Sequence, residues 1–142
     1  NGKNSACFYC SRLRRKRLFT LSAHYGLTHL AFGHTADDLA ATFVMNLFHG
    51  GRVDGMAMKE PFFQGRLMVI RPLLWVEKRD VTRAAKAWKL PVFKNACPSA
   101  GSSRRIEVMD WMDPVLRREK GFKRSMLNAL RRFQLDRTLE RS

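Results

Sequence analysis

Apolar residues along the chain recur at helical spacing in several stretches and form short unbroken runs in others. The helical spacing predicts helices over residues 10–25, 39–48, 77–90 and 122–135, and a shorter helix over 106–111 with a break near Pro114. The unbroken runs predict buried strands at residues 27–32 and 67–70, and a third short strand at 91–93. Helices that alternate with strands indicate an α/β fold, in which a partial parallel sheet of Rossmann-like type has flanking helices and a helical C-terminal tail.

Glycine, proline and capping residues set the ends of these elements. Gly26 ends the first helix, and Gly33 ends the strand that follows it. Thr35 is a favourable N-cap for the helix over 39–48, and Asp37 and Asp38 fall in its first turn, where the helix dipole favours carboxylates.

The first and last of the longer helices are expected to be amphipathic and basic. Around the first helix, Leu13, Leu18, Leu21 and Tyr25 alternate with arginine and lysine, which predicts a basic face. The last helix is expected to bury Met126, Leu127, Leu130 and Phe133 and to expose Lys123, Arg124, Arg131 and Arg132.

Composition narrows the class of protein. The 142 residues have the length of one domain, and 45% are hydrophobic, so the chain should fold around a core. No apolar run approaches the roughly 20 residues that a membrane span needs, and the start does not read as a signal peptide. With only three cysteines, these features predict a cytoplasmic protein that is not held by disulfides.

The net charge changes this picture most. The formal charge of +15 comes from 27 Lys and Arg residues against 12 Asp and Glu. A surface of this kind favours a polyanion as partner, and nucleic acid is the preferred candidate. A packing role like that of ribosomal proteins and an acidic membrane surface remain open as alternatives.

The candidate chemistry begins with Cys7 and Cys10, a Cys-x-x-Cys pair that runs into Arg12, Arg14 and Arg15. Two thiolates at this spacing can bind one metal or bridge each other, and Cys97 is the third cysteine. A zinc site that borrows a histidine, an iron–sulfur cluster with one iron lacking a protein thiolate, and a simple thiol pair with an unrelated third thiol all remain open.

Arg104 and Arg105 follow Cys97 as the first arginines follow Cys10. If the three cysteines share a site, both arginine groups converge there and face an anion, whether a cluster, a pyrophosphate or an RNA phosphate.

Asp37, Asp38 and the preceding His34 form a second candidate site. The two carboxylates lie in the turn after a predicted strand, where ligands bind in open α/β sheets, and they can hold Mg²⁺ or take a proton. Helix capping is the alternative for the carboxylates, and a hydrogen bond to the turn is the alternative for the histidine.

Several of these motifs occur together in one known family. Cys-x-x-Cys-Ser-Arg-Leu-Arg-Arg, Gly-His-x-x-Asp-Asp, Thr-x-x-x-Asn-x-x-x-Gly-Gly, Val-Ile-Arg-Pro-Leu and a late cysteine resemble the tRNA 2-thiocytidine synthetases, which are PP-loop ATP pyrophosphatases. The matching positions here are Cys7 to Arg15, Gly33 to Asp38, Thr42, Asn46, Gly50-Gly51, Val69 to Leu73, and Cys97. The resemblance covers roughly the first hundred residues in consistent order.

The resemblance implies a fold of the adenine nucleotide alpha hydrolase type and an adenylation reaction. The family uses ATP to activate the C2 oxygen of a cytidine in the tRNA anticodon loop, position 32 by implication, and sulfur then replaces that oxygen. A 4Fe-4S cluster held by three cysteines carries the incoming sulfur, which a donor such as a cysteine desulfurase supplies. Carried over, Cys7, Cys10 and Cys97 are the cluster ligands, and Asp37 and Asp38 are catalytic residues beside ATP and Mg²⁺.

The remaining assignments distribute the other motif residues. Gly33, His34, Arg14 and Arg15 are expected at the cofactors, and tRNA is expected to bind Arg12, Arg104, Arg105, Lys123 and Arg124. Residues 1–105 would be the C-terminal part of the PP-loop ATPase domain, and 106–142 a basic helical extension.

The chain departs from the family pattern in three places. The Ser-Gly-Gly-x-Asp-Ser loop that wraps the ATP phosphates is absent from the sequence and is expected upstream of Asn1, so this chain alone is predicted to be inactive. Thr35-Ala36 follows the histidine where the family more usually has a basic or polar residue, and Lys94 stands where many relatives have a further cysteine. An open strand edge at residues 27–32 or 67–70 would favour a homodimer.

Two other functions compete with this interpretation. One is a non-catalytic RNA-binding module with a structural zinc site. The other is a redox protein that uses a disulfide between Cys7 and Cys10, which is disfavoured because the pair precedes a basic helix without a thioredoxin-like pattern.

Overall fold

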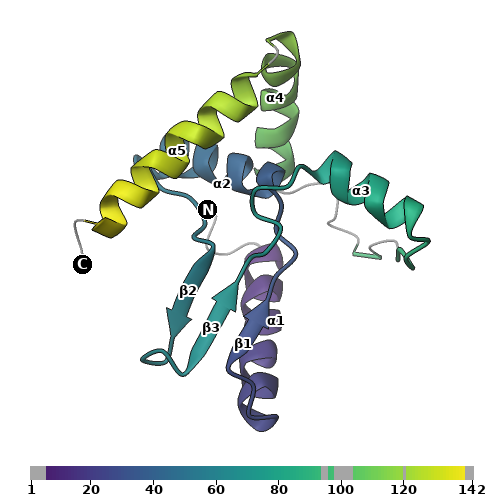
Figure 1. Ribbon diagram of the computed structural model, residues 1–142, viewed down its shortest axis with the longest axis vertical. Coiled ribbons are helices and arrows are strands. Elements are labelled where there is room, and N and C mark those ends of the chain that lie inside the picture. Colours follow the sequence, from purple (N-terminus) through teal and green to yellow (C-terminus); the bar gives the residue numbers. More distant parts are fainter. Residues whose placement is uncertain (1–5, 94–95, 98–103, 120, 140–142) are drawn as a thin grey trace. The chain divides into compact units, whose positions relative to one another are not determined.

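The structure, a computed structural model, describes residues 6–93, 96–97, 104–119 and 121–139, without the side chains of Arg104, Arg117 and residues 135–139 (Figure 1). The chain divides into two compact units. The first comprises residues 1–32 and 58–71, and the second comprises residues 33–57 and 72–142. Helices and strands together confirm the α/β class.

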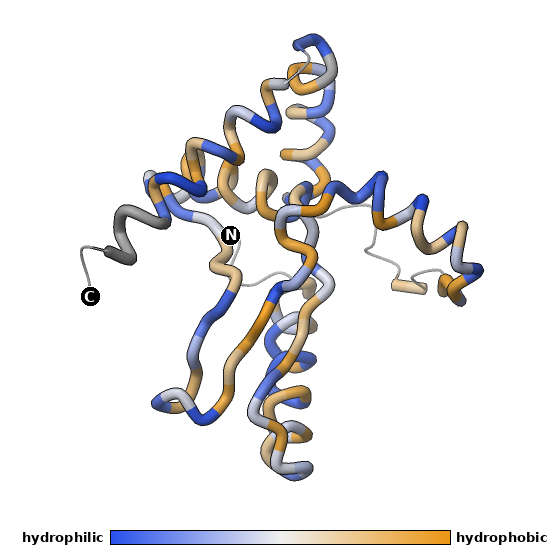
Figure 2. Tube along the Cα trace, viewed as in Figure 1, coloured by the Kyte–Doolittle hydropathy of each residue, from blue (hydrophilic) through white to orange (hydrophobic). Residues whose placement is uncertain are grey.

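The first unit contains one helix and a three-stranded sheet. Its elements are α1 (Ala6–His24), β1 (His29–Ala31), β2 (Lys59–Phe62) and β3 (Leu67–Ile70). The strand order is β1-β3-β2, with β1 parallel and β2 antiparallel to β3. In register, Leu30 and Glu60 both pair with Val69, and β3 is hydrophobic along its length (Figure 2). The sheet is therefore mixed, whereas the sequence predicted parallel strands.

Strand β2 is the element that the sequence did not predict. Pro61 lies within it, and proline removes a backbone donor, which argues against a central strand. The structure places β2 at an edge of the sheet, where the missing donor costs nothing. The predicted strand over 27–32 is shorter and less buried than expected, since only Leu30 of β1 is half-buried. Strand β1 lies at the other edge and β3 is central.

Helix α1 ends as the sequence predicts. Gly26 has a φ of 64° and the Leu27 N–H donates to the Ser22 carbonyl at 2.8 Å, which is the hydrogen bond of a Schellman cap. The predicted basic face is wrong, because hydrophilic and hydrophobic residues are interspersed around every turn of α1 (Figure 2). Leu13 is 65% exposed, while Phe19 turns toward the sheet and contacts the ring of Phe62 at 5.0 Å between centroids.

The second unit is helical. It contains α2 (Ala36–Gly50), α3 (Lys78–Ala87), α4 (Arg104–Arg118) and α5 (Phe122–Leu139), and α2 packs against α4 and α5. The buried core of this unit consists of Ala36, Leu39, Ala40, Val44, Leu74, Val108, Met112, Leu127 and Leu130. These residues come from three helices and one loop, so α4 and α5 complete the core around α2 instead of forming a loose tail.

Two predictions are wrong in this unit. Residues 91–93 form no strand and are exposed, with Phe93 90% exposed. Helix α4 continues through Pro114 to Arg118, because Met112 and Leu116 pack against the same core on both sides of the proline. The helix expected over residues 77–90 is present as α3, with Val81, Ala84 and Ala85 half-buried, whereas Trp88 after it is 73% exposed.

Helix α5 confirms part of its predicted face. Leu127 and Leu130 are buried and Met126 is half-buried, whereas Phe133 is 37% exposed. Among the helices in the described part of the chain, none has both the length and the apolar character that crossing a membrane requires. The predicted domain boundary after residue 105 is not tested by these contacts and stays a prediction.

Candidate functional site

The cysteine pair lies at the start of α1. Cys7 and Cys10 are three residues apart and Arg14 follows four residues later, so all three project from one side of a helix with 3.6 residues per turn. Both thiols are exposed, and no disulfide joins any of the three cysteines of the chain. The two thiolates can therefore reach one metal from a single helical face.

The third predicted ligand lies in the other unit. Cys97 is exposed in the second unit, so its approach to Cys7 and Cys10 stays a prediction. Within either unit, the described His, Cys, Asp and Glu side chains form no group of three that could hold a metal ion. The donor chemistry of Cys7 and Cys10 nevertheless suits a thiophilic metal, because two exposed cysteines at this spacing can bind one metal ion.

The arginines after Cys10 do not all share its face. Arg14 lies on the cysteine side of α1, whereas Arg12 and Arg15 line a pocket on another side of the helix together with Phe8. A rotation of about 100° per residue separates the two groups. Helix α1 thus presents cations on two sides, and the convergence of its arginines with Arg104 and Arg105 on one anion stays a prediction.

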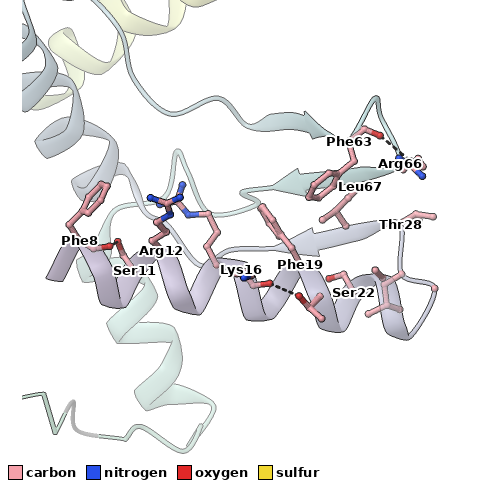
Figure 3. Close-up of a pocket in the computed structure, with 15 residues that line it drawn as sticks. Phe8, Ser11, Arg12, Lys16, Phe19, Ser22, Thr28, Phe63, Arg66 and Leu67 are labelled. Carbon is pink, nitrogen blue, oxygen red and sulfur yellow. Dashed lines mark hydrogen bonds between the residues drawn. The ribbon is translucent and has the colours of Figure 1, made fainter. Parts of the chain in front are cut away.

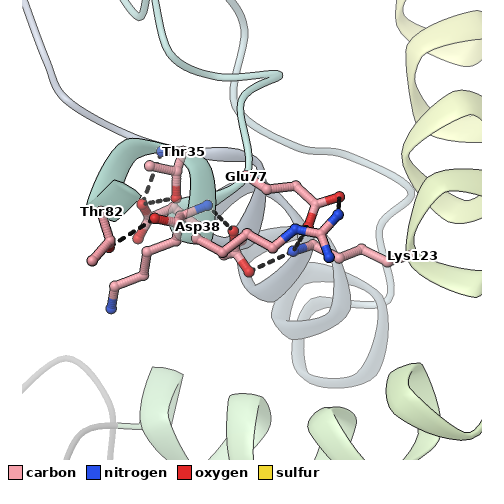
Figure 4. A network of polar contacts seen from close by, with 8 residues as sticks. Thr35, Asp38, Glu77, Thr82 and Lys123 are labelled. Carbon is pink, nitrogen blue, oxygen red and sulfur yellow. Dashed lines mark hydrogen bonds and ion pairs between the residues drawn. The ribbon is translucent and has the colours of Figure 1, made fainter. Parts of the chain in front are cut away.

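Asp38 caps α2 (Figure 4). Its Oδ2 accepts hydrogen bonds from the Thr35 backbone N–H at 2.9 Å and from the Thr35 hydroxyl at 3.0 Å. This is the carboxylate half of a capping box, in which the N3 side chain satisfies the N-cap donor. The other oxygen, Oδ1, lies 3.4 Å from Nη1 of Arg105 in α4. The capping alternative for Asp38 is confirmed.

Asp37 joins three helices of the second unit. Its Oδ2 accepts the backbone N–H of Lys78 at the start of α3 at 2.7 Å, and its Oδ1 accepts Nζ of Lys123 in α5 at 2.5 Å. Lys123 also lies 3.6 Å from a carboxylate oxygen of Glu77. Burial alone would raise the pKa of Asp37, but the hydrogen bonds from Lys123 and Lys78 outweigh it and hold the pKa below its ordinary value. Asp37 is therefore an ionised linker between helices.

These contacts bear on the predicted catalytic roles. Both oxygens of Asp37 already have donors, so Mg²⁺ binding there needs an exchange of partners. A carboxylate with a lowered pKa is also a weak proton acceptor near neutral pH. His34 is half-buried beside the cap, and Gly33 has open space where a Cβ would stand. The catalytic and cofactor-binding roles of these residues stay predictions.

The basic residues predicted to bind tRNA differ in exposure. Lys123 is not on the surface as predicted: its side chain is 20% exposed and ion-paired. Arg105 is partly tethered by Asp38, with Nη2 3.5 Å from the Thr42 hydroxyl. Arg124 is exposed, and the side chain of Arg104 lies outside the described residues, as does Lys94.

Sequence reasoning missed Glu77 and Lys78 as partners of this network. Lys78 contributes a backbone N–H, which every residue but proline has, so no residue type could have marked it. The pocket beside Arg12 and Arg15 was also missed, because it depends on the packing of α1 against a hairpin that contains the unpredicted strand β2.

Known proteins resemble this chain in sequence and in structure. Residues 10–103 match the PP-loop domain family. The chain is 38% identical over 125 residues to tRNA-cytidine(32) 2-sulfurtransferase of Rhizobium etli, covering 87% of the chain and 43% of the relative. It is 39% identical over 128 residues to the enzyme of the same name from Bordetella petrii, covering 89% and 40%. The chain thus spans less than half the length of these relatives.

A solved structure is similar as well. The U34-tRNA thiolase NcsA from Methanococcus maripaludis, with its 4Fe-4S cluster, matches with a TM-score of 0.71 and 27% sequence identity, covering 91% of this chain and 44% of that one. The family match itself extends over more than half of the chain and includes Cys10, Asp37, Asp38 and Cys97. The chain therefore belongs to the PP-loop domain family.

Proposed function

We propose that the chain is part of an ATP-dependent tRNA sulfurtransferase that replaces the C2 oxygen of a cytidine, at position 32 of the anticodon loop, with sulfur. The observation that carries this proposal is the 38% identity over 125 residues to tRNA-cytidine(32) 2-sulfurtransferase. The chain covers 43% of that relative, so the activity is proposed for the whole protein.

The proposed reaction has two displacements. The C2 oxygen of the cytidine attacks the α-phosphorus of ATP, and pyrophosphate leaves with the broken phosphoanhydride bond. A sulfur nucleophile then attacks C2, the C2–oxygen bond breaks, and AMP leaves. Mg²⁺ would offset the charge of the triphosphate, and a cysteine desulfurase would supply the sulfur.

The exposed thiols support the proposed cluster site. Cys7 and Cys10 would provide two thiolates from one face of α1, and Cys97 would provide the third. A 4Fe-4S cluster held by three protein thiolates supplies an iron that can accept sulfur. Arg14, one turn after Cys10, would attract the anionic sulfur donor or an RNA phosphate to the same side. We also propose that the protein is a cytoplasmic homodimer, because β1 leaves one edge of the sheet open to a second copy.

Metal analysis of protein purified without oxygen tests the proposal. We expect iron and acid-labile sulfide in the wild-type protein, with a broad visible absorption band. Cys7→Ser, Cys10→Ser and Cys97→Ser should each lose most of both, because each removes one thiolate ligand. Ser11→Ala is the matched control, since its hydroxyl only donates to the Phe8 carbonyl at 2.8 Å within the same turn.

Other outcomes would contradict specific parts of the proposal. Zinc without sulfide would favour an RNA-binding module with a structural metal. Full iron and sulfide in Cys97→Ser would show that Cys97 is not a ligand. A protein that retains neither metal after anaerobic reconstitution would leave the cysteine pair without its proposed role.

A further inference from the structure

A large pocket opens within the first unit, between α1 and the hairpin of β2 and β3 (Figure 3). Its volume is about 1040 Å³, and residues from α1, from the turn after it and from the hairpin line it. Sites for small molecules and cofactors measure about 300–1000 Å³, so the pocket has room for a ligand the size of a nucleotide. Cys7 and Cys10 do not line it, and the acidic network around Asp37 does not contribute to it.

Aromatic rings form one wall of this pocket. Phe8 and Phe19 reach it from α1, and Phe63 reaches it from the hairpin. The rings of Phe19 and Phe63 meet edge to face at 5.7 Å between centroids, and Phe63 remains 54% exposed. An edge-to-face pair with one ring still open can receive a third flat ring by stacking.

The backbone of the hairpin holds Phe63 in an unfavourable conformation. Phe63 has a φ of 52° and Gln64 a φ of 58°, in the left-handed region that glycine and asparagine adopt far more easily. A bulky aromatic residue with a positive φ is strained by about 1–2 kcal/mol. Strain of this kind is concentrated at functional sites, and here it places a half-exposed ring at the mouth of the pocket.

The rest of the lining is strongly cationic. Arg12, Arg15, Lys16 and Arg66 line the pocket and no acidic residue does. In the described part of the chain, none of these four forms an ion pair with a carboxylate. The first unit has nine Lys and Arg residues against one acid, Glu60, which is paired with Arg71 at 2.8 Å. The charge of the pocket is therefore complementary to an anionic ligand.

We propose that this pocket binds one unpaired RNA nucleotide, whose base stacks against Phe63 and Phe19 while the flanking phosphates contact Arg12, Lys16 and Arg66. Stacking on exposed aromatic rings and ion pairing with phosphates together are how proteins bind single-stranded nucleic acid. A phospholipid headgroup would use the cations but not the stacked rings. The combination thus favours RNA over an acidic membrane.

The position of the pocket on α1 indicates which nucleotide the pocket binds. Cys7 and Cys10 do not line the pocket, so the nucleotide in the pocket is not the one that reacts. We assign it to a neighbouring loop nucleotide of the same RNA, which is held while α1 presents its cysteines. This assignment rests on the proposed function, whereas the binding of an unpaired nucleotide does not.

The test uses the full chain and two turn variants. Phe63→Asn removes the ring but supplies a residue that tolerates a positive φ, so the hairpin should still form. Gln64→Asn makes the same change one residue later and keeps the ring. We expect Phe63→Asn to weaken binding of a single-stranded oligoribonucleotide by roughly 5- to 150-fold, the range for loss of one stacked base, and Gln64→Asn to leave it unchanged.

Salt dependence separates stacking from charge. The logarithmic salt slope should stay the same in Phe63→Asn and fall by roughly 1.4 in the double variant Arg12→Gln/Lys16→Gln, since each lost phosphate contact on a single strand removes about 0.7. Lys86→Gln in α3 is the control for charge in the other unit. A 2-aminopurine base in the oligonucleotide should be quenched by wild type and not by Phe63→Asn.

The outcomes distinguish this inference from the proposed function. If Phe63→Asn binds RNA as wild type does, the pocket assignment is wrong, while iron and sulfide in the protein would still support the sulfurtransferase. If wild type binds duplex RNA or anionic vesicles as tightly as the single strand, the pocket is a general anion site. If wild type binds single strands and Phe63→Asn binds them more weakly, but no iron is found, the pocket assignment is supported and the proposed function is contradicted.

Discussion

At the scale of single residues, Asp37 shows how one side chain of α2 can link two other helices. Its oxygens receive one donor from α3 and one from α5, and its side chain is 20% exposed. Because the folded state lowers the pKa of Asp37, the carboxylate adds stability above the unfolded-state pKa of about 3.9. That contribution is lost as the pH falls through the lower, folded-state pKa.

We therefore predict that Asp37→Asn destabilises the protein by about 1–3 kcal/mol near neutral pH, as urea denaturation would measure. The loss arises because, in the described part of the chain, Lys123 then keeps the more distant Glu77 as its anionic partner. Below about pH 4 the difference between variant and wild type should shrink, since protonation weakens the wild-type contact as well.

Asp80→Asn is the matched control in the same unit. Asp80 lies 3.7 Å from Arg83, whose side chain is 78% exposed, and such surface pairs contribute little. The free energy of unfolding of the Asp80→Asn variant should stay within about 0.5 kcal/mol of that of wild type. Equal, pH-independent effects of the two substitutions would contradict the role assigned to Asp37.

The role of a residue could be predicted from the sequence where its partners are only a few residues away. Thr35 and Asp38 stand three apart before an apolar helix, which is the spacing of a capping box, and the structure confirms capping. The partners of Asp37 could not be predicted, because Lys123 is 86 residues away in the sequence. Contacts at that separation depend on how the helices pack against one another, and the periodicity of apolar residues along the chain does not encode that packing.

At the scale of elements, the ends of helices were predicted better than the strands. Gly26 ends α1 because its left-handed backbone is easily adopted only without a Cβ. Strand β2 contains Pro61, which is compatible with an edge strand but not with a central one, so residue types alone did not indicate a strand there. Residues 91–93 have strand-forming types but no neighbouring strand among the described residues, and a strand requires a partner.

The loop after α2 shows how closely elements approach. A Cβ on Gly55 would lie 2.9 Å from terminal methyl carbons of Leu39 and Leu130, which are fully or nearly fully buried. Both leucines belong to the buried core, so a Cβ at residue 55 would have to push at least one of them out of its packed position. We predict that Gly55→Ala destabilises the protein by about 1–3 kcal/mol through overpacking, measured by chemical denaturation.

Gly50→Ala is the control for Gly55→Ala. It stands at the last residue of α2, where a Cβ would meet only the Arg52 side chain at an ordinary 3.5 Å. Stability should be unchanged or slightly higher, because alanine is the better helix former. A Gly55→Ala protein as stable as Gly50→Ala would show that the leucines repack without cost.

At the scale of the whole molecule, composition predicted the polyanionic partner class but not where the charge lies. The sequence suggested a basic face on α1, yet α1 carries arginines all round, and the first unit, which is about a third of the chain, carries eight of the fifteen net positive charges. The chain path, which leaves this unit after residue 32 and returns at residue 58, adds Lys59, Arg66 and Arg71 to the cations that the sequence already clusters in α1. A linear charge count cannot contain that information.

The last prediction concerns ATP. Two donors at the start of α2 are already used, because the Thr35 N–H binds Asp38 at 2.9 Å and the Ala36 N–H binds the Val76 carbonyl at 2.9 Å. Helix N-termini bind phosphates through free N–H groups, and Asp37 adds negative charge in the same turn. We expect calorimetry with ATP and Mg²⁺ to show no saturable binding to the 142-residue chain below millimolar concentrations.

Asp37→Asn provides the informative comparison. If the carboxylates repel the triphosphate, the variant should bind ATP no more weakly than wild type, and removal of Mg²⁺ should change neither titration. Micromolar binding by wild type that disappears in Asp37→Asn or without Mg²⁺ would show the opposite: the contacts to Lys123 and Lys78 would then be a resting state that a nucleotide-bound metal replaces. In that case Asp37 would act as a metal ligand, and its links to α3 and α5 would have to break whenever ATP binds.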